Sequence, residues 1–131
     1  MPTAPSLPTT ITAGVTSTHV ADSQTVHTII NTIYLANIGT TETGNFTVTQ
    51  AMSGEVKPVN SASTVAVTVP VLAARTYLEL HRMGAGAVTL TTSGTTLAPP
   101  TGATATPRVQ NSTISLLWLT TTLVLVGGDL T

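Results

Sequence analysis

Residues 59–70 (V-N-S-A-S-T-V-A-V-T-V-P) contain the alternation that most constrains what this chain can fold into. From position 64 onward one set of side chains is apolar and the other is small or polar: Val65, Val67 and Val69 against Thr64, Ala66 and Thr68. Because successive side chains of a strand point to opposite faces of a sheet, this pattern predicts a strand with one buried face. Pro70 should end the strand, since proline has no N–H to donate to a central ladder.

Several further stretches repeat this character. Residues 75–83 also alternate, with Leu78, Leu80 and Arg82 on one side and Tyr77, Glu79 and His81 on the other. A strand at 87–91 follows the glycine turn at 84–86, and two more strands are expected at 113–119 and 123–126. Upstream, F-T-V-T-Q (46–50) leads through a turn at 53–55 and V-K-P-V into the first strand. Short strands separated by glycine and proline turns predict an all-β domain over residues 46–131, an antiparallel β-sandwich or a jelly-roll-like fold.

The composition supports an all-β chain and excludes several classes of function. About 30 of the 131 residues are threonine, which is β-branched and favours strands. Only 7% of the residues are charged and the net charge is −1, so the chain has no basic surface for nucleic acid. Without cysteine it has neither a disulfide framework nor a thiolate metal site. No apolar run approaches the roughly 20 residues of a membrane-spanning helix, and the proline-rich start is unlike a signal peptide.

The first 18 residues are predicted to form an extended arm that becomes ordered only when it binds a partner. They are rich in proline, threonine and serine and offer few side chains to bury. The arm residues that we expect to dock on a partner are Pro2, Pro5, Leu7, Pro8 and Ile11.

A short amphipathic segment follows, beginning at Asp22, a residue type that often caps helices. Its apolar side chains recur at helical spacing and form one stripe: Val26, Ile29, Ile30 and Ile33. These residues are weak helix formers, so a strand over residues 25–35 is the alternative. An isoleucine-rich helical stripe favours the association of three or more helices, which makes it a candidate oligomer interface. Residues 36–45, rich in glycine and threonine, are predicted to be a linker that completes an N-terminal region of residues 1–45.

No arrangement of residues in the sequence predicts catalysis. The five carboxylates are scattered along the chain, at Asp22, Glu42, Glu55, Glu79 and Asp129. Glu79 and His81 share one strand face, which allows either a histidine–carboxylate contact or simply a half-exposed polar face. The glycine turn at 84–86 lacks the helix and lysine of a phosphate loop, and no serine lies in a G-x-S-x-G motif.

Two further residue types are candidates for ligand sites. His19 and His27 would form a metal site only if several copies of the chain brought them together, so we expect no metal. Trp118 is expected in the core or in a contact between subunits, with a sugar-stacking site as the alternative. We predict that the chain is not an enzyme and binds no cofactor.

An ordered set of motifs resembles a β-domain that recurs in virion proteins of tailed bacteriophages. In chain order the motifs are N-S-A-S-T-V-A-V-T-V-P, R-M-G-A-G-A-V-T-L, G-T-T-L, R-V-Q-N-S-T-I-S-L-L and V-G-G-D-L, and the resemblance covers about residues 46–130. Asp22, His27 and Asn31 also resemble the segment that often precedes such domains. The family includes tail fibres, minor tail proteins and head fibres or decoration proteins, notably of phages that infect actinobacteria. The chain departs from the family at Val124, where the family has tryptophan, and it lacks the long shaft of a tail fibre.

The resemblance implies a non-enzymatic structural protein of the virion, made in the cytoplasm of the bacterial host. A chain with so few charges also has weakly protected strand edges, which natural proteins cover by association. We therefore expect a homotrimer that decorates the capsid, as a head fibre or decoration protein, and docks through its N-terminal arm on the major capsid protein or on a tail protein. The alternative is a minor tail protein or tail-fibre tip that binds host-surface carbohydrate. No nucleic acid or membrane partner is expected.

Overall fold

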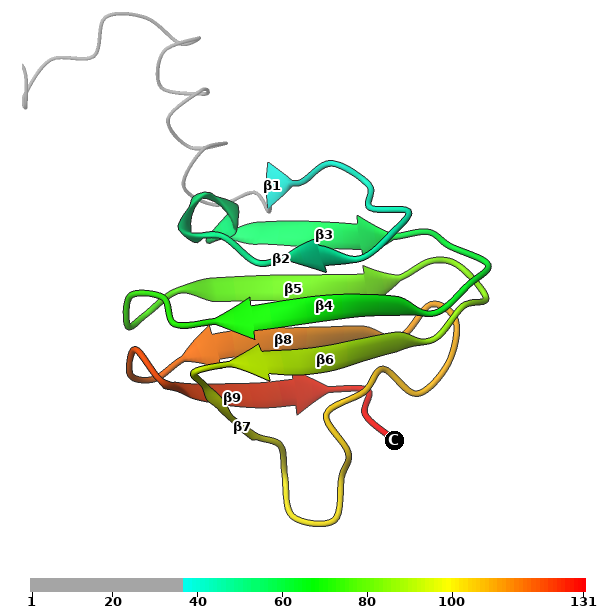
Figure 1. Ribbon diagram of the computed structural model, residues 1–131. Coiled ribbons are helices and arrows are strands. Elements are labelled where there is room, and N and C mark those ends of the chain that lie inside the picture. The colour runs from blue at the N-terminus through cyan, green and yellow to red at the C-terminus, as the bar shows by residue number, and fades with distance from the viewer. Residues whose placement is uncertain (1–36) are drawn as a thin grey trace, which may run out of the picture. The chain divides into compact units, whose positions relative to one another are not determined.

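The computed structural model describes residues 37–131, and these residues form nine strands and one short 3-10 helix (Figure 1). The strands are β1 (Asn37–Ile38), β2 (Phe46–Thr47), β3 (Glu55–Val59), β4 (Val65–Pro70), β5 (Tyr77–Arg82), β6 (Val88–Ser93), β7 (Thr96–Ala98), β8 (Thr113–Trp118) and β9 (Leu123–Gly128). The 3-10 helix, η1, spans Gln50–Met52. The predicted docking-arm and oligomer-stripe residues lie outside the described part of the chain and stay predictions: Pro2, Pro5, Leu7, Pro8, Ile11, Val26, Ile29, Ile30 and Ile33.

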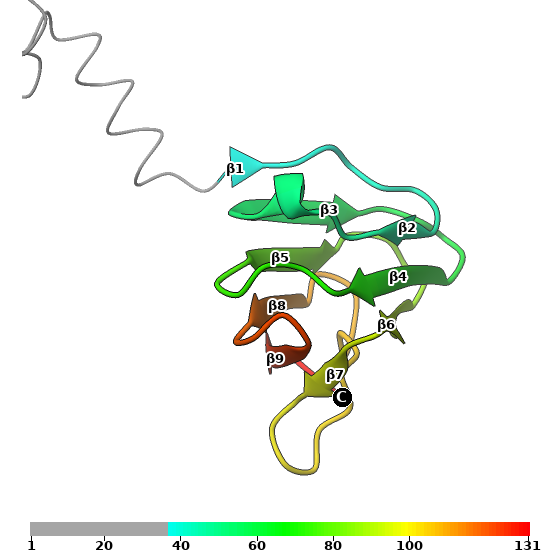
Figure 2. The same ribbon diagram turned by 60° about the vertical axis from the view of Figure 1, so that its left-hand side comes forward.

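The chain alternates between two sheets, which are seen as two layers in Figure 2. One sheet has six strands in the order β1-β3-β5-β8-β9-β7, and the other has three in the order β2-β4-β6. Successive strands from β1 to β6 lie in different sheets, so each pair forms one coil that stacks in parallel on the previous coil. Val65 pairs with Val88 and Val56 with Glu79, an offset of 23 residues in both sheets (88 minus 65, 79 minus 56). The described residues thus have a β-solenoid-like arrangement, extended by the antiparallel hairpin β8–β9 on the larger sheet.

The all-β prediction is confirmed, but the prediction of an antiparallel sandwich or jelly roll is wrong in its strand directions. Five of the seven ladders are parallel, and only β5–β8 and β8–β9 are antiparallel. Alternating polarity records which side chains face the core, and it has the same period in parallel and antiparallel strands. The direction is decided here by the crossovers, because each strand from β3 to β6 reaches its sheet by way of a strand of the other sheet.

The core lies between the two sheets and confirms the predicted register of β4. Val65, Val67 and Val69 are each at most 1% exposed, whereas Thr68 on the opposite face is half-buried. Trp118 is fully buried, and its Nε1 donates a hydrogen bond to the carbonyl oxygen of Pro70 at 3.0 Å. The other buried apolar residues of the core are Val48, Val59, Leu78, Leu80, Val88, Ile114, Leu116, Val124 and Val126.

The corner between β5 and β6 explains the glycine turn at 84–86. Gly84 and Gly86 lie directly against the preceding corner, where a Cβ atom on either residue would collide with main-chain atoms of Ser61 or Ser63. Gly86 also donates its N–H to the carbonyl oxygen of Ser61 at 2.8 Å. The two glycines therefore let one coil stack closely on the one before it.

Residues 37–45, which belong to the segment predicted as a linker, contribute to the first coil. β1 pairs with β3, and Glu42 forms an isolated bridge with Val59. Lys57 of β3 is turned inward, and its Nζ lies 2.9 Å from a carboxylate oxygen of Glu42 and donates to Thr40 Oγ1 at 2.8 Å. The Lys57 side chain is only 4% exposed. These contacts make residues 37–45 part of the β-domain, so the linker prediction is wrong. The sequence did not reveal β1 because a strand of two residues is too short to show a periodic pattern.

Candidate interaction surfaces

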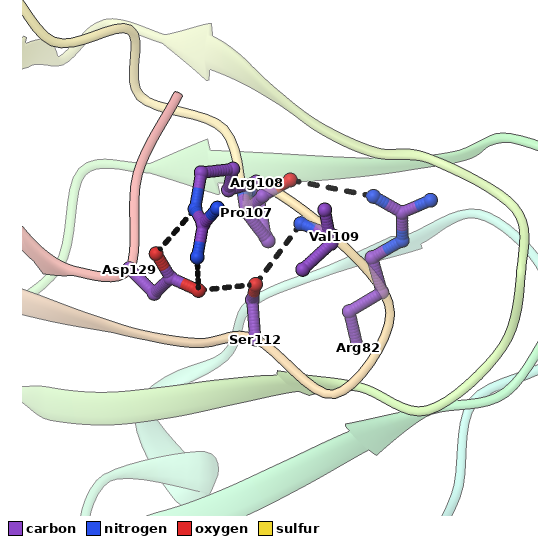
Figure 3. A network of polar contacts seen from close by, with 6 residues as sticks. All are labelled: Arg82, Pro107, Arg108, Val109, Ser112 and Asp129. Atoms are coloured by element: carbon purple, nitrogen blue, oxygen red, sulfur yellow. Dashed lines mark hydrogen bonds and ion pairs between the residues drawn. The ribbon is translucent and has the colours of Figure 1, made fainter.

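A polar network joins the loop 99–112 to the C-terminal end of the chain (Figure 3). Arg108 donates from Nε and Nη2 to the carboxylate of Asp129 at 2.8 and 3.3 Å, and Ser112 Oγ donates to the same carboxylate at 2.8 Å. These hydrogen bonds, from Arg108 first and Ser112 second, lower the pKa of Asp129. The main chain continues the contact, since the N–H of Thr104 donates to the carbonyl oxygen of Thr131 at 2.6 Å. Because both charged side chains are exposed, the ion pair adds little stability and mainly fixes the position of the loop.

Arg82 lies beside the same loop (Figure 3). Its Nη2 donates to the carbonyl oxygen of Ala85 at 2.7 Å and its Nη1 to that of Pro107 at 3.4 Å. Its buried Nε has no hydrogen-bond partner among residues 37–131. Both acceptors are main-chain carbonyls, so the guanidinium joins two loops of its own chain. We therefore assign the network to the architecture of this end of the fold rather than to chemistry on a ligand.

The histidine–carboxylate contact that the sequence allowed is not formed. His81 Nδ1 lies 2.7 Å from Thr113 Oγ1, and Glu79 instead accepts a hydrogen bond from the phenol of Tyr77 at 2.7 Å. This hydrogen bond, together with partial burial and the charge of Glu79, raises the pKa of Tyr77. In the described part of the chain no group of three or more histidine and carboxylate side chains is placed to hold a metal ion. His19 lies outside the described residues, as does His27.

The aromatic residues offer little surface to a sugar ring. Trp118 is 0% exposed, so its indole belongs to the core and cannot stack on a ligand. Phe46 is half-buried and packs against the core. Tyr77, at 39% exposure, is the most exposed of the aromatic residues within 37–131.

The outer face of the three-stranded sheet consists of small, uncharged side chains. Thr47, Thr68 and Thr91 are in register across β2, β4 and β6, and the Oγ1 atoms of Thr68 and Thr91 are 3.4 Å apart. The hydroxyl of Thr91 also donates to the carbonyl oxygen of Val67 at 3.4 Å, so part of its hydrogen-bonding capacity is used within the sheet. We call this surface the threonine face and define it by Thr47, Ala66, Thr68, Pro70, Thr89, Thr91 and Ser93.

On the outer face of the larger sheet, where β5, β8 and β9 lie side by side (Figure 1), apolar side chains gather at the end nearest the β8–β9 turn. The polar residues Glu79, His81, Thr113 and Ser115 occupy the rest of that face on β5 and β8. Tyr77, Leu117 and Leu125 occupy one register across these strands. Leu119 and Leu123 meet at the β8–β9 turn, where the N–H of Leu119 donates to the carbonyl oxygen of Leu123 at 2.9 Å. These five residues define the leucine face, in which Leu119 is 54% exposed and Leu125 37%. We take this exposed apolar group as a candidate contact surface.

The leucine face was not predicted, although the sequence contains a signal for it. S-L-L-W-L (115–119) and L-V-L-V (123–126) are apolar in both phases of the alternation. One phase enters the core through Trp118 and Val124, and the other forms the leucine face. Strands that are apolar in both phases indicate that both of their faces are covered.

The chain matches no protein-family model, and comparisons with curated proteins and with solved structures find no similar protein. Among residues 37–131 no helix is long and apolar enough to cross a membrane. The two outward faces are therefore the main structural guide to function.

Proposed function

We propose that this chain is a non-enzymatic structural protein of a tailed-phage virion, a homotrimeric head fibre or decoration protein that docks on the major capsid protein through its N-terminal arm. The observation that carries the proposal is the small number of charged side chains left unpaired among the described residues. Two ion pairs, Lys57–Glu42 and Arg108–Asp129, neutralise four of the eight charged residues within 37–131. Few charges therefore remain to repel neighbouring molecules from the threonine face and the leucine face, and this favours a stable assembly.

The positions of the phage-like motifs also support this proposal. N-S-A-S-T-V-A-V-T-V-P covers one coil corner and β4, and R-M-G-A-G-A-V-T-L covers the next corner and the first three residues of β6. The motifs thus contain the residues that stack one coil on another, such as Gly84 and Gly86 against Ser61 and Ser63. They serve the architecture of the domain, as expected for a protein whose role is structural.

In this proposal the two regions of the chain have separate tasks. The N-terminal arm, with its prolines and few apolar side chains, attaches the protein to the capsid shell. The β-domain forms a neutral knob on the outer surface of the head.

A capsid-binding experiment tests this division. The full chain is mixed with undecorated capsids of the phage that carries its gene, beside a variant in which residues 2–11 are replaced by a glycine–serine segment of equal length. We expect the full chain to sediment with the capsids at a saturating stoichiometry, and the variant to stay in the supernatant with an unchanged circular dichroism spectrum. Equal binding by both proteins would contradict docking through the arm, and binding by neither would contradict the head location.

A tail-fibre tip or minor tail protein that binds host carbohydrate is the second candidate, and the exposed ring of Tyr77 favours it. The ring offers a stacking surface, and the neighbouring Glu79 carboxylate offers a hydrogen-bond acceptor. Binding of the protein to cell-wall glycans, measured on an array, should then be lost in Tyr77→Ala. If the unmodified protein binds no glycan at all, the tail-tip candidate is rejected.

A further inference from the structure

The leucine face (Tyr77, Leu117, Leu119, Leu123 and Leu125) lies on the outer side of a sheet whose inner side already covers the core. None of the five side chains belongs to the core or packs against it. Three of them are more than a third exposed: Tyr77, Leu119 and Leu125. Within residues 37–131 the fold thus covers Leu117 and Leu123 in part and leaves the other three side chains exposed on the outer side of the sheet.

The charges beside this face are balanced. Glu79 lies two residues after Tyr77 on the same outer face of β5, and its carboxylate accepts the phenolic hydrogen bond at 2.7 Å. The exposed Arg75 precedes Tyr77 by two residues. The chain thus has an exposed positive residue two positions before the tyrosine and a negative residue two positions after it. A second copy is complementary to it, because Arg75 of one chain can lie near Glu79 of the other.

Other occupants fit this chemistry less well. An anionic membrane surface or a nucleic acid requires a cluster of basic residues, and Arg75 alone does not provide one. A glycan site commonly uses several aromatic platforms, and the face has the single ring of Tyr77. The best match for a leucine surface with one charge of each sign is another apolar protein surface with the same two charges. A second copy of this chain has such a surface.

We propose that the leucine face is the contact surface between copies of this chain, and that three such faces pack around the axis of the homotrimer. This inference rests on the proposed trimeric state. It proposes that residues of the β-domain stabilise the trimer, in addition to the predicted contact between the isoleucine stripes of residues 26–33.

Charged substitutions in the full chain test the proposal. Leu125→Glu places a carboxylate within the leucine face, and Leu119→Glu does so at the exposed turn. Thr91→Glu is the matched control, because it adds the same charge to the exposed outer face of the other sheet. By sedimentation equilibrium at micromolar concentration, the unmodified chain and Thr91→Glu should have the mass of three chains. Both leucine variants should have the mass of one 13.3 kDa chain, with an unchanged circular dichroism spectrum.

Cross-linking gives an answer even if a charged variant fails to fold. The chain has no cysteine, so Leu119→Cys and Thr91→Cys each place a single thiol on one outward face. A short bismaleimide should join Leu119→Cys chains into dimers and leave Thr91→Cys chains as monomers. Trimers that persist in the folded Leu125→Glu variant, or Leu119→Cys chains that do not cross-link, overturn the proposal.

Capsid binding by the same variants separates this inference from the proposed function. Monomeric leucine variants that still bind capsids through the arm would support the leucine face and leave the docking role intact. An unmodified chain that is monomeric at micromolar concentration would overturn the trimer and the leucine face together. Trimers that resist every leucine-face substitution would preserve the trimeric state and reject only this contact surface.

Discussion

Exchanging valine and threonine at neighbouring positions of β4 tests the buried face of the fold. Val67 is 0% exposed in the core, with Phe46 and Leu90 beside it in register. Val67→Thr keeps the side-chain volume nearly constant and places a hydroxyl group among apolar neighbours. Desolvation of that unpaired hydroxyl should therefore dominate, and we expect a loss of about 1–3 kcal/mol in the free energy of unfolding.

Thr68→Val is the matched change on the opposite face. The Thr68 hydroxyl is on a half-exposed residue and lies 3.4 Å from Thr91 Oγ1, a long contact for two hydroxyls. Its removal should change the free energy of unfolding by less than about 0.5 kcal/mol. Because the two variants exchange the same residue types at adjacent positions, intrinsic strand propensity largely cancels between them.

Thermal unfolding followed by circular dichroism gives the Tm of each variant and of the unmodified chain. A cost of about 2 kcal/mol corresponds to a fall of roughly 8–16 °C in Tm for a domain of this size. We expect such a fall for Val67→Thr and almost none for Thr68→Val. Equal destabilisation would mean that both faces of β4 are covered, and a larger loss for Thr68→Val would mean that the register is shifted by one residue. Either result would refute the reasoning.

Three further predictions concern the coil corners, the interior ion pair and the C-terminal network. Gly86→Ala should cost about 2 kcal/mol or more in urea unfolding because its methyl group meets the backbone of the preceding corner, whereas Gly44→Ala, which has open space, should cost less than about 0.5 kcal/mol. Equal costs for the two glycines would argue against close coil stacking. Glu42→Ala leaves the buried Lys57 ammonium without its carboxylate and should cost on the order of 3 kcal/mol, most of which the added change Lys57→Met should restore. A double variant no more stable than Glu42→Ala would contradict the interior ion pair. In an NMR titration the Asp129 carboxyl should have a pKa below its ordinary range, and about 1 M salt should raise it by screening the exposed pair. A pKa insensitive to salt would show that the pair does not form in solution.

Strand positions could be predicted from the sequence because apolar and polar residues alternate where one face of a strand is buried. The valines of β4 and the pair Leu78 and Leu80 of β5 lie in the core as their phase predicted. The direction of a strand cannot be predicted from that pattern, because the alternation is the same in parallel and antiparallel strands. It depends on the 23-residue offset between coils, which appears only when S-A-S-T-V-A-V-T (61–68) is aligned with G-A-G-A-V-T-L-T (84–91). The two segments have small residues at the corner but are identical only at Ala62/Ala85, Val65/Val88 and Thr68/Thr91, so the repeat is weak in sequence and clear in space.

The surfaces were less predictable than the core. Alternation identifies one buried face for each strand, so the runs around Leu117 and Leu125 predict strands but do not show that their outer side chains form a second surface. Nothing in the sequence predicts that Lys57 faces the core, because lysine is rarely buried without a partner. Its partner, Glu42, belongs to a loop that the two-residue strands β1 and β2 hold in place, and such short strands leave no pattern in the sequence.

Electron cryo-microscopy of intact phage particles tests most directly the central claim, the proposed location of this chain in a virion. The predicted result is density for three copies of the β-domain on the outer surface of the head, with the arm residues against the capsid shell. Density at the tip of the tail, or the absence of the chain from purified particles, would contradict the account.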